Sequence, residues 1–318
     1  MMSTLLPNVV AVTGSEGYIG SILCKMLHEV GSMVFPCDIR PSLHSPWTRS
    51  FDDDGYVDTI VEQNVSTIYH LAATSLVGPD AEDPLLYMWN NTSRTTNFLH
   101  KLVQRGWKGH IIFASTAAVY QGSVFEQPLT EKDKTDPCTV YGKSKLRCEE
   151  VLNMCSEHYG IDVTSFRFFN VAGAYHDAGE ELFDTHLLSR ICWAALTDNP
   201  VTVYGNDYST RDGTCIRDYV DVRDVCRAQM FAAQNKVYGT FNLGTKHGLT
   251  VFEMIDNFNV YTNNRVKYTI GNRRPGDLHH LTADPSLLKT HGFEYRFNLE
   301  QTITSTWQHF KRISTHGL

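Results

Sequence analysis

The chain has 318 residues, of which 42% are hydrophobic and 20% are charged. This composition is ordinary for a folded globular protein and argues against a disordered, collagen-like or low-complexity chain. The formal net charge of −7 argues against general binding to nucleic acid or to anionic membranes, because both need an excess of lysine and arginine. The negative net charge does not exclude a small anionic ligand that is held by a few arginines.

The eight cysteines are too sparse for a disulfide scaffold, and no two of them have the CxxC spacing of a zinc site or a thioredoxin-like motif. We therefore expect reduced cysteines in a cytoplasmic protein. No apolar run approaches the roughly 20 residues of a membrane span. The first residues lack the basic leader of a signal peptide, so we expect none.

Short β-branched runs alternate with amphipathic helical patterns over the first half of the chain. Parallel strands need crossover helices, so this alternation predicts an α/β fold with a doubly wound parallel sheet of the Rossmann type. We expect strands at 8–13, 33–38, 66–71, 110–114 and 162–167, and helices at 18–30, 56–63, 85–105 and 141–159.

The alternation loosens after about Asn170, where the candidate elements are 186–196, 201–204 and 251–259. The chain is also longer than one hydrophobic core usually supports. We therefore expect a dinucleotide-binding domain over 1–170. A smaller mixed α/β domain over 171–318 would mainly bind the substrate and would be interleaved with returning segments of the first domain.

Three glycines stand between the first predicted strand and the first predicted helix, at Gly14, Gly17 and Gly20. Glycines at this spacing allow a tight turn and let backbone N–H groups approach a pyrophosphate at the helix N-terminus. Asp38 closes the next strand, where a carboxylate accepts hydrogen bonds from the adenosine ribose and repels a 2′-phosphate. This pattern favours NAD over NADP, although Arg40 is a mild signal for the phosphate.

A second motif combines Ser115 and Thr116 at the end of a strand with Tyr141 and Lys145 in a helix. Tyr141 and Lys145 are four residues apart, so they share one helical face. A nearby ammonium lowers the pKa of a tyrosine and favours its phenolate form. Thr116 supplies a hydroxyl to the same reacting oxygen. We therefore predict Thr116, Tyr141 and Lys145 as the catalytic residues.

These motifs, in this order, resemble the extended short-chain dehydrogenase/reductase superfamily, and within it the UDP-glucose 4-epimerases. The glycine loop reads TGxxGYIG, and the narrower match comes from segments 167–174, 204–208, 212–219 and 273–277. The stretch YGNDYSTRDGTCIRDY is the most specific part. The resemblance covers about residues 8 to 310.

The resemblance implies which residues bind the two ligands. Around NAD it places Tyr18, Ile19, Asp38, Leu71, Ala72, Ala73, Asn91, Tyr141, Lys145 and Phe169. Around the nucleotide sugar, beside Thr116, it places Asn170, His186, Leu187, Thr202, Val203, Tyr204, Arg217, Arg274 and Asp277.

The sequence departs from the family pattern in two places that concern NAD. Ser75 stands where family members often carry lysine, so one cofactor or phosphate contact is altered. The segment 38–52 is shorter than usual. The resemblance implies an adenine-contacting aspartate there, and Asp52, Asp53 and Asp54 are equivalent candidates.

Two arginines from distant segments, Arg217 and Arg274, could clamp a diphosphate. The alternative for Arg217 is a salt bridge with Asp218 or Asp221. His186 follows residues 184–185 at a predicted helix start, where unpaired backbone N–H groups suit phosphate. A histidine in this place can equally be a surface or cap residue. His279-His280 suggests a metal, but no third ligand is in view, and we expect no metal site.

The resemblance implies epimerisation at C4 of a UDP-hexose, through transient oxidation to the 4-keto sugar with tightly bound NAD. Leu281 occupies a sugar-pocket position that is often tyrosine or a small residue, so N-acetylated substrates remain open, as do UDP-uronic acids and UDP-pentoses. Dehydratases and decarboxylases place acidic residues where this chain has Ala117 and Ala118, so we rank them lower. A catalytically silent NAD-sensing protein ranks lowest. The resemblance also implies a homodimer packed through helices 85–105 and 141–159, and we expect neither a nucleic-acid nor a membrane partner.

Overall fold

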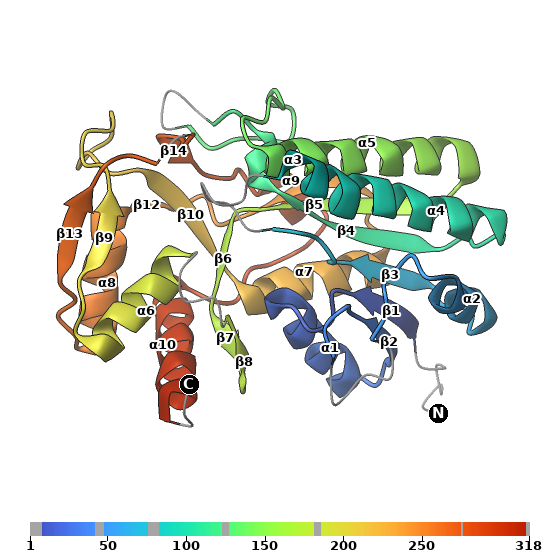
Figure 1. The fold of residues 1–318 in the computed structure, drawn as a ribbon, viewed down its shortest axis with the longest axis horizontal. Coiled ribbons are helices and arrows are strands. Elements are labelled where there is room, and N and C mark those ends of the chain that lie inside the picture. Colours follow the sequence, from blue (N-terminus) through green and yellow to red (C-terminus); the bar gives the residue numbers. More distant parts are fainter. Residues whose placement is uncertain are drawn as a thin grey trace.

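The computed structural model describes residues 8–41, 48–75, 83–122, 127–180, 186–274 and 276–315. Positions 76–78, 184–185 and 275 of the motifs above lie outside these ranges. Figure 1 shows a large sheet with its helices on one side of the molecule and a smaller group of strands and helices on the other.

Six parallel strands form the large sheet, in the order β11-β5-β4-β3-β1-β2. The strands are β1 Val9–Thr13, β2 Met33–Cys37, β3 Thr67–His70, β4 His110–Thr116, β5 Asp162–Phe168 and β11 Gly239–Leu243. The predicted doubly wound parallel sheet is confirmed. Strand β11 was not predicted, because it returns from far along the chain. The order reverses beside β1, and ligands of such sheets bind outside the carboxyl ends of the strands at this point.

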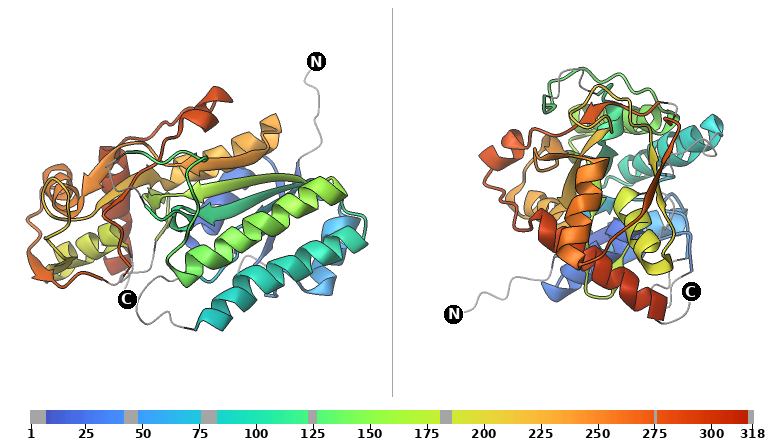
Figure 2. Two further views of the ribbon diagram at one scale, coloured as in Figure 1. Left: turned by 90° about the horizontal axis from the view of Figure 1, so that it is seen from above. Right: turned by 90° about the vertical axis from the view of Figure 1, so that its left-hand side faces the viewer.

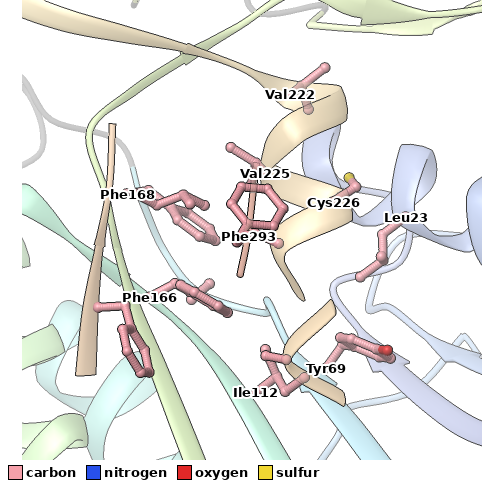
Figure 3. Close-up of a cluster of buried hydrophobic side chains, with 14 of the residues drawn as sticks. Leu23, Tyr69, Ile112, Phe166, Phe168, Val222, Val225, Cys226 and Phe293 are labelled. Atoms are coloured by element: carbon pink, nitrogen blue, oxygen red, sulfur yellow. The ribbon is translucent and has the colours of Figure 1, made fainter. Parts of the chain in front are cut away.

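Helices cover both faces of this sheet. They are α1 Tyr18–Glu29, α2 Asp54–Glu62, α4 Arg94–Gln104, α5 Val140–Tyr159 and α7 Val222–Asn235. Successive strand residues point to opposite faces. Accordingly, Val10 and Val12 pack with α1 and α7, whereas Ala11 packs with α2, α4 and α5. Figure 3 shows the first of these clusters, with Leu23 of α1 and Cys226 of α7.

The helix predicted over 85–105 is not continuous. It consists of α3 Pro84–Tyr87, the π-helical segment η1 Met88–Ser93 and α4. Within η1, the Asn91 side chain donates to the Ser144 hydroxyl at 2.9 Å, and the Thr92 hydroxyl donates to the Ser144 carbonyl at 3.1 Å. These contacts to α5 accompany the wider turn, and π-helical turns are frequent at functional sites.

The smaller group has three sheets. The strands are β6 Asn170–Ala172, β10 Ile216–Asp221, β12 Gly248–Thr250 and β14 His280–Leu281 in one sheet, β9 Val201–Tyr204 with β13 Tyr268–Gly271, and β7 Ala174–Tyr175 with β8 Ala178–Gly179. The helices are α6 Leu187–Thr197, α8 Val251–Thr262 and α10 Leu299–Thr315, and the short elements are η2 Ala117–Val119 and α9 Ser286–Thr290. Figure 2 shows this group from two further sides.

The later predictions hold with shifted ends. The strand 201–204 is confirmed, and the elements expected at 186–196 and 251–259 are α6 and the longer α8. Helices α7 and α10 were not predicted. All eight cysteines are free thiols. In the described part of the chain, no helix has the length and apolarity that a membrane crossing requires.

Candidate active site

The glycine loop follows β1 at the carboxyl edge of the large sheet. Gly14 has φ +75°, and a Cβ there would lie 2.7 Å from the Ala72 nitrogen. A Cβ on Gly20 would lie 2.0 Å from the Gly14 carbonyl oxygen. Gly17 precedes the first residue of α1. The loop therefore excludes side chains where its backbone is in close contact, and it leaves the N-terminus of α1 facing outward, as a pyrophosphate requires.

Asp38 lies directly after β2 and is buried beside the glycine loop. Its carboxylate accepts the Glu16 N–H at 3.0 Å and the Arg40 N–H at 2.9 Å. The Arg40 guanidinium also contacts Asp38, at 3.2 Å. Arg40 is therefore paired with Asp38 in the protein alone, which weakens its value as a signal for a 2′-phosphate.

The loop after β3 is held by Asn91 of η1. The Asn91 side chain accepts the Thr74 N–H at 2.8 Å and donates to the Thr74 carbonyl at 3.0 Å. Residues 71–73 are half-buried along this loop, and Ser75 is exposed at its described end. Asn91 was assigned to NAD through the resemblance. Its hydrogen bonds in the structure indicate that it positions the loop.

The predicted catalytic residues meet at the end of β4 and the start of α5. Thr116 ends β4, and the N-cap Thr139 fixes the start of α5 by accepting the Gly142 N–H at 3.0 Å. Tyr141 follows in the first turn and is hydrogen-bonded to Thr116. Burial raises the pKa of Tyr141 to about 12, and the bond to Thr116 offsets part of that rise. The structure thus brings these two hydroxyls together.

Lys145 is buried one turn further along α5. Its ammonium donates to the Ala114 carbonyl at 2.8 Å and lies over the Phe113 ring at 4.6 Å. Burial lowers the pKa of Lys145 to about 8. We expected Lys145 to lower the pKa of Tyr141 below that of a free tyrosine. In the protein without ligands, the pKa of Tyr141 is raised instead. The physical reason is that burial dominates at Tyr141, while the ammonium is bound to the strand end.

A buried ion pair behind this site was not predicted. The Arg167 guanidinium on β5 holds the Glu149 carboxylate on α5 with two bonds, at 2.7 and 3.0 Å. Ser115, directly before Thr116, also donates to Glu149, and Arg167 donates to the Tyr120 hydroxyl at 2.8 Å. Glu149 is four residues after Lys145 on the same face of α5, and this spacing was the available signal. The network ties β4, β5 and α5 together under the candidate catalytic residues.

Asn170 and His186 meet on the substrate side of the molecule. They line one small cavity together with Tyr219 of β10 and Glu180. His186 is the N-cap residue of α6, its Nδ1 contacts the buried carboxylate of Glu180, and Leu187 begins the helix. Glu180 and Tyr219 were not predicted as site residues. No sequence pattern marks Glu180, because its contact depends on how α6 is placed.

Arg217 projects from β10 and is paired with Asp277 at 3.4 Å. Its guanidinium also donates to two backbone carbonyls, at 2.8 and 2.9 Å. Asp218 and Asp221 have other partners. The alternative that Arg217 pairs with Asp218 or Asp221 is therefore wrong, and the structure instead brings Arg217 together with Asp277, a second predicted substrate residue.

Arg274 lies over the ring of Tyr204 at 4.0 Å, at the end of β9. The buried Cys215 thiol has a raised pKa because of burial, and both Arg217 and Arg274 act on it in the opposite direction. Both guanidiniums are therefore close enough to Cys215 to act on it electrostatically. Strand β9 carries the predicted residues 202–204 on this side, with Val203 buried and its two neighbours half-buried.

Leu281 and Phe169 belong to one buried cluster with Ala117, the residue after Thr116. Leu281 is 9% exposed. This cluster connects the predicted sugar-pocket position with the end of β4. Leu281 is thus packed in the same buried cluster as the residue that follows Thr116.

The three candidate adenine contacts all have protein partners. Asp52 is paired with Arg94 at 3.0 Å, and Asp54 with Lys101 at 3.0 Å. The Asp53 side chain caps the N-terminus of α2. Their protein contacts leave the choice among them open.

His279 and His280 lie in different surroundings. The centroids of the His279 and Tyr208 rings are 5.5 Å apart, whereas His280 is buried in β14. Within the ranges that the structure describes, no three His, Cys, Asp or Glu side chains are grouped to hold a metal ion.

A glycine loop on a doubly wound parallel sheet, with a Thr-Tyr-Lys set at the strand ends, defines an enzyme of the short-chain dehydrogenase/reductase fold. The model of the NAD dependent epimerase/dehydratase family matches residues 10–244. The chain belongs to this family.

Individual relatives match nearly the whole chain. The UDP-glucose 4-epimerase of Halalkalibacterium halodurans is 34% identical over 326 residues, and the match covers 97% of this chain and 97% of the relative. The UDP-glucose 4-epimerase of Lacticaseibacillus casei is 36% identical over 292 residues, with 86% of this chain and 87% of the relative covered. The crystal structure of the Stenotrophomonas maltophila enzyme, with bound NAD and formylated UDP-arabinopyranose, has a TM-score of 0.90 and 30% identity. It covers 97% of this chain and 99% of its own.

Proposed function

We propose that the protein is an NAD-dependent UDP-glucose 4-epimerase, which interconverts UDP-glucose and UDP-galactose. The observation that carries this proposal is the position of Thr116 and Tyr141, hydrogen-bonded to each other at the strand ends of a sheet that also presents the glycine loop. The relatives named UDP-glucose 4-epimerase support the substrate class.

The residues of the candidate cofactor site fit NAD. The glycine loop has no room for side chains, and the Asp38 carboxylate at the end of β2 disfavours a 2′-phosphate. The residues that would hold NAD are Gly14, Gly17, Tyr18, Ile19, Gly20, Asp38, Leu71, Ala72, Ala73, Ser75, Tyr141, Lys145 and Phe169, with Asn91 positioning the loop. When bound, NAD supplies reversible hydride transfer at C4 of the sugar.

Tyr141 exchanges the proton of the sugar 4-hydroxyl in this mechanism. Thr116 is its hydrogen-bond partner and holds the phenol oxygen in place. Lys145 provides positive charge one helical turn away and is itself oriented by Ala114. Because Tyr141 gives back the proton that it takes, the chain's own groups return to their starting state after each turnover.

The anionic diphosphate would be anchored far from the reacting carbon by Arg217 and Arg274, with Asn170, His186, Leu187 and residues 202–204 around the nucleotide. Because the nucleotide supplies the binding energy, the sugar itself is held loosely and is free to rotate. Asp277 orients Arg217. We propose the domain division of 1–170 and 171–318 on the same basis, since all of these anchors except Asn170 come from the second part, with returning segments of the first domain interleaved in it.

Replacing Arg217 by methionine tests the anchor. We expect KM for UDP-galactose to rise by about 10- to 100-fold, because a charge-assisted contact to the diphosphate is lost. The matched control is Arg273→Met, whose guanidinium pairs with the exposed Asp207 at 2.6 Å. That control should stay within about threefold of the wild type. Equal KM values for the two variants would contradict the assigned anchor.

The residue type at Leu281 does not decide which sugar the site accepts. A leucine that packs against Phe169 and Ala117 is smaller than a tyrosine and larger than a serine or cysteine. A UDP-pentose is a second candidate substrate, because a similar solved structure binds formylated UDP-arabinopyranose. Dehydratase chemistry is disfavoured because Ala117 and Ala118, in η2, carry no acid or base.

We also propose a cytoplasmic homodimer formed through the helices α3 to α5. These helices lie side by side in Figures 1 and 2. Exposed apolar side chains come from α3, from η1 and from α5. Leu85 is 77% exposed, Trp89 62% and Met154 51%. Large apolar side chains that are this exposed favour an interface on these helices.

Product analysis tests the proposed function. Purified protein is incubated in parallel with UDP-glucose, UDP-N-acetylglucosamine and UDP-arabinopyranose, and the sugars are separated after hydrolysis. We expect UDP-galactose from the first, without stoichiometric release of NADH, because the reaction is redox-neutral. No conversion of UDP-glucose would reject the proposed activity, and conversion of the pentose alone would replace its substrate.

A further inference from the structure

The contact between Glu180 and His186 is the feature that the proposed function leaves unused. Glu180 is 5% exposed, although it carries a carboxylate. One of its oxygens contacts Nδ1 of His186, and the other accepts the Ser189 hydroxyl at 2.6 Å. A buried carboxylate needs a positive partner or several hydrogen bonds to remain charged. The positive partner available here is the imidazolium form of His186.

The imidazole is anchored on one side and accessible on the other. The His186 side chain is 52% exposed, in contrast to Glu180. Because Nδ1 is held by Glu180, the outward nitrogen Nε2 is left to meet a ligand. His186 also precedes the first turn of α6, where the helix dipole favours an anion.

The cavity beside His186 is bordered by β10, the strand that also carries Arg217. His186, Glu180, Asn170 and Tyr219 line it together. Tyr219 is two residues after Arg217 on β10, so both side chains leave the same face of that strand. The face of β10 that borders the His186 cavity at Tyr219 is therefore the face from which Arg217 projects.

We propose that Glu180 is a positioning residue that keeps His186 in its cationic form, so that the imidazolium binds the diphosphate of the UDP-sugar together with Arg217. This inference rests on the proposed function for the identity of the ligand. It adds a charge-setting residue that lies behind the substrate contact.

The pKa of His186 is shifted in the direction that the proposal requires. Burial alone lowers the pKa of His186, but the hydrogen bond to Glu180 and the negative charge of Glu180 together outweigh burial and raise it. Other titratable groups face the pair from the elements packed around it, namely Tyr18 of α1, Tyr219 of β10 and Cys192 of α6, and burial raises the pKa of each. They therefore stay neutral while His186 titrates. Because the pKa of His186 is raised, the cation persists to higher pH than in a free histidine and is lost as the pH rises further.

The experiment measures the affinity for UDP-glucose against pH in the Tyr141→Phe background, where turnover is expected to be at least about 100-fold slower. The diphosphate of a UDP-sugar keeps its charge throughout the range in which histidine titrates, so the ligand adds no pH dependence there. We expect the affinity to fall at least about tenfold as His186 loses its proton. In E180Q this fall should occur at lower pH, and in H186N it should disappear.

Ser189→Ala is the matched control. It removes the other partner of Glu180 and leaves the imidazole contact in place, so it should keep the wild-type pH profile. The histidine ring signals in NMR, assigned by their loss in H186N, give the titration of His186 without any ligand. A lower titration midpoint in E180Q than in wild type is expected.

Two results would overturn the proposal: an unchanged His186 midpoint in E180Q, or an affinity that stays constant while NMR shows His186 losing its proton. Failure of the proposed function looks different. If UDP-glucose binds with the expected pH profile and wild-type protein makes no UDP-galactose, the catalytic function is rejected and the role of Glu180 is supported.

Discussion

Replacing Tyr141 by phenylalanine is expected to lower kcat for UDP-galactose by at least about 100-fold. The phenol is the group placed to exchange the proton of the 4-hydroxyl, and proton transfer by a positioned side chain contributes typically about 10²–10⁴-fold. Tyr141 meets Thr116 at the end of β4, and phenylalanine has no hydroxyl to exchange a proton there. The rate is measured by product formation, and bound NAD is measured after denaturation of the purified variant.

The matched control is Tyr159→Phe, which removes the same atom at the other end of the same helix. Tyr159 is 52% exposed at the last residue of α5, so we expect kcat to change less than about twofold. Tyr141→Phe should retain NAD, because the glycine loop and Asp38 are untouched. Activity close to wild type in Tyr141→Phe would reject the assigned proton exchange.

Replacing Arg167 by methionine should have the largest effect on stability. Its guanidinium and the Glu149 carboxylate are 8% and 4% exposed. Removing one partner of such a pair leaves a buried charge without compensation, which costs about 3–5 kcal/mol. We expect the free energy of unfolding in urea to fall by that amount. The melting temperature should fall with it.

A control on the same helix separates burial from charge. Arg147 of α5 pairs with Glu150 at 2.6 Å, and both side chains are about half exposed. Arg147→Met should therefore cost less than about 1 kcal/mol. Adding Glu149→Gln to Arg167→Met should recover part of the loss, because the stranded charge is gone. Equal losses for Arg147→Met and Arg167→Met would show that the buried pair does not stabilise the protein.

The parts of the fold that the sequence predicted are those encoded by neighbours in the chain. The β-α alternation predicted the parallel sheet. Gly17 and Gly20 are required by backbone contacts within a few residues, whereas Gly14 is required by the loop after β3 at Ala72. The helix expected over 85–105 was wrong in its continuity, because contacts of η1 with the loop after β3 and with α5 override the local helical pattern.

The electrostatic expectations were less reliable, because charge interactions depend on distance and burial. The spacing of Tyr141 and Lys145 placed both on one face of α5, but it did not reveal that the ammonium is bound to Ala114. Likewise, Asp218 and Asp221 are closer in sequence to Arg217 than Asp277 is. Arg217 nevertheless pairs with Asp277, since residue 217 on β10 lies beside residue 281 on β14.

The sequence by itself therefore determined the sheet, the dinucleotide loop and the residue types from which the candidate site is built. These features follow from periodicity, glycine spacing and motifs that are short along the chain. Only the tertiary structure decided which charges are paired. It placed Glu149 against Arg167 and Glu180 against His186, because an ion pair forms where folding brings two groups into one buried space, and sequence distance carries no information about that.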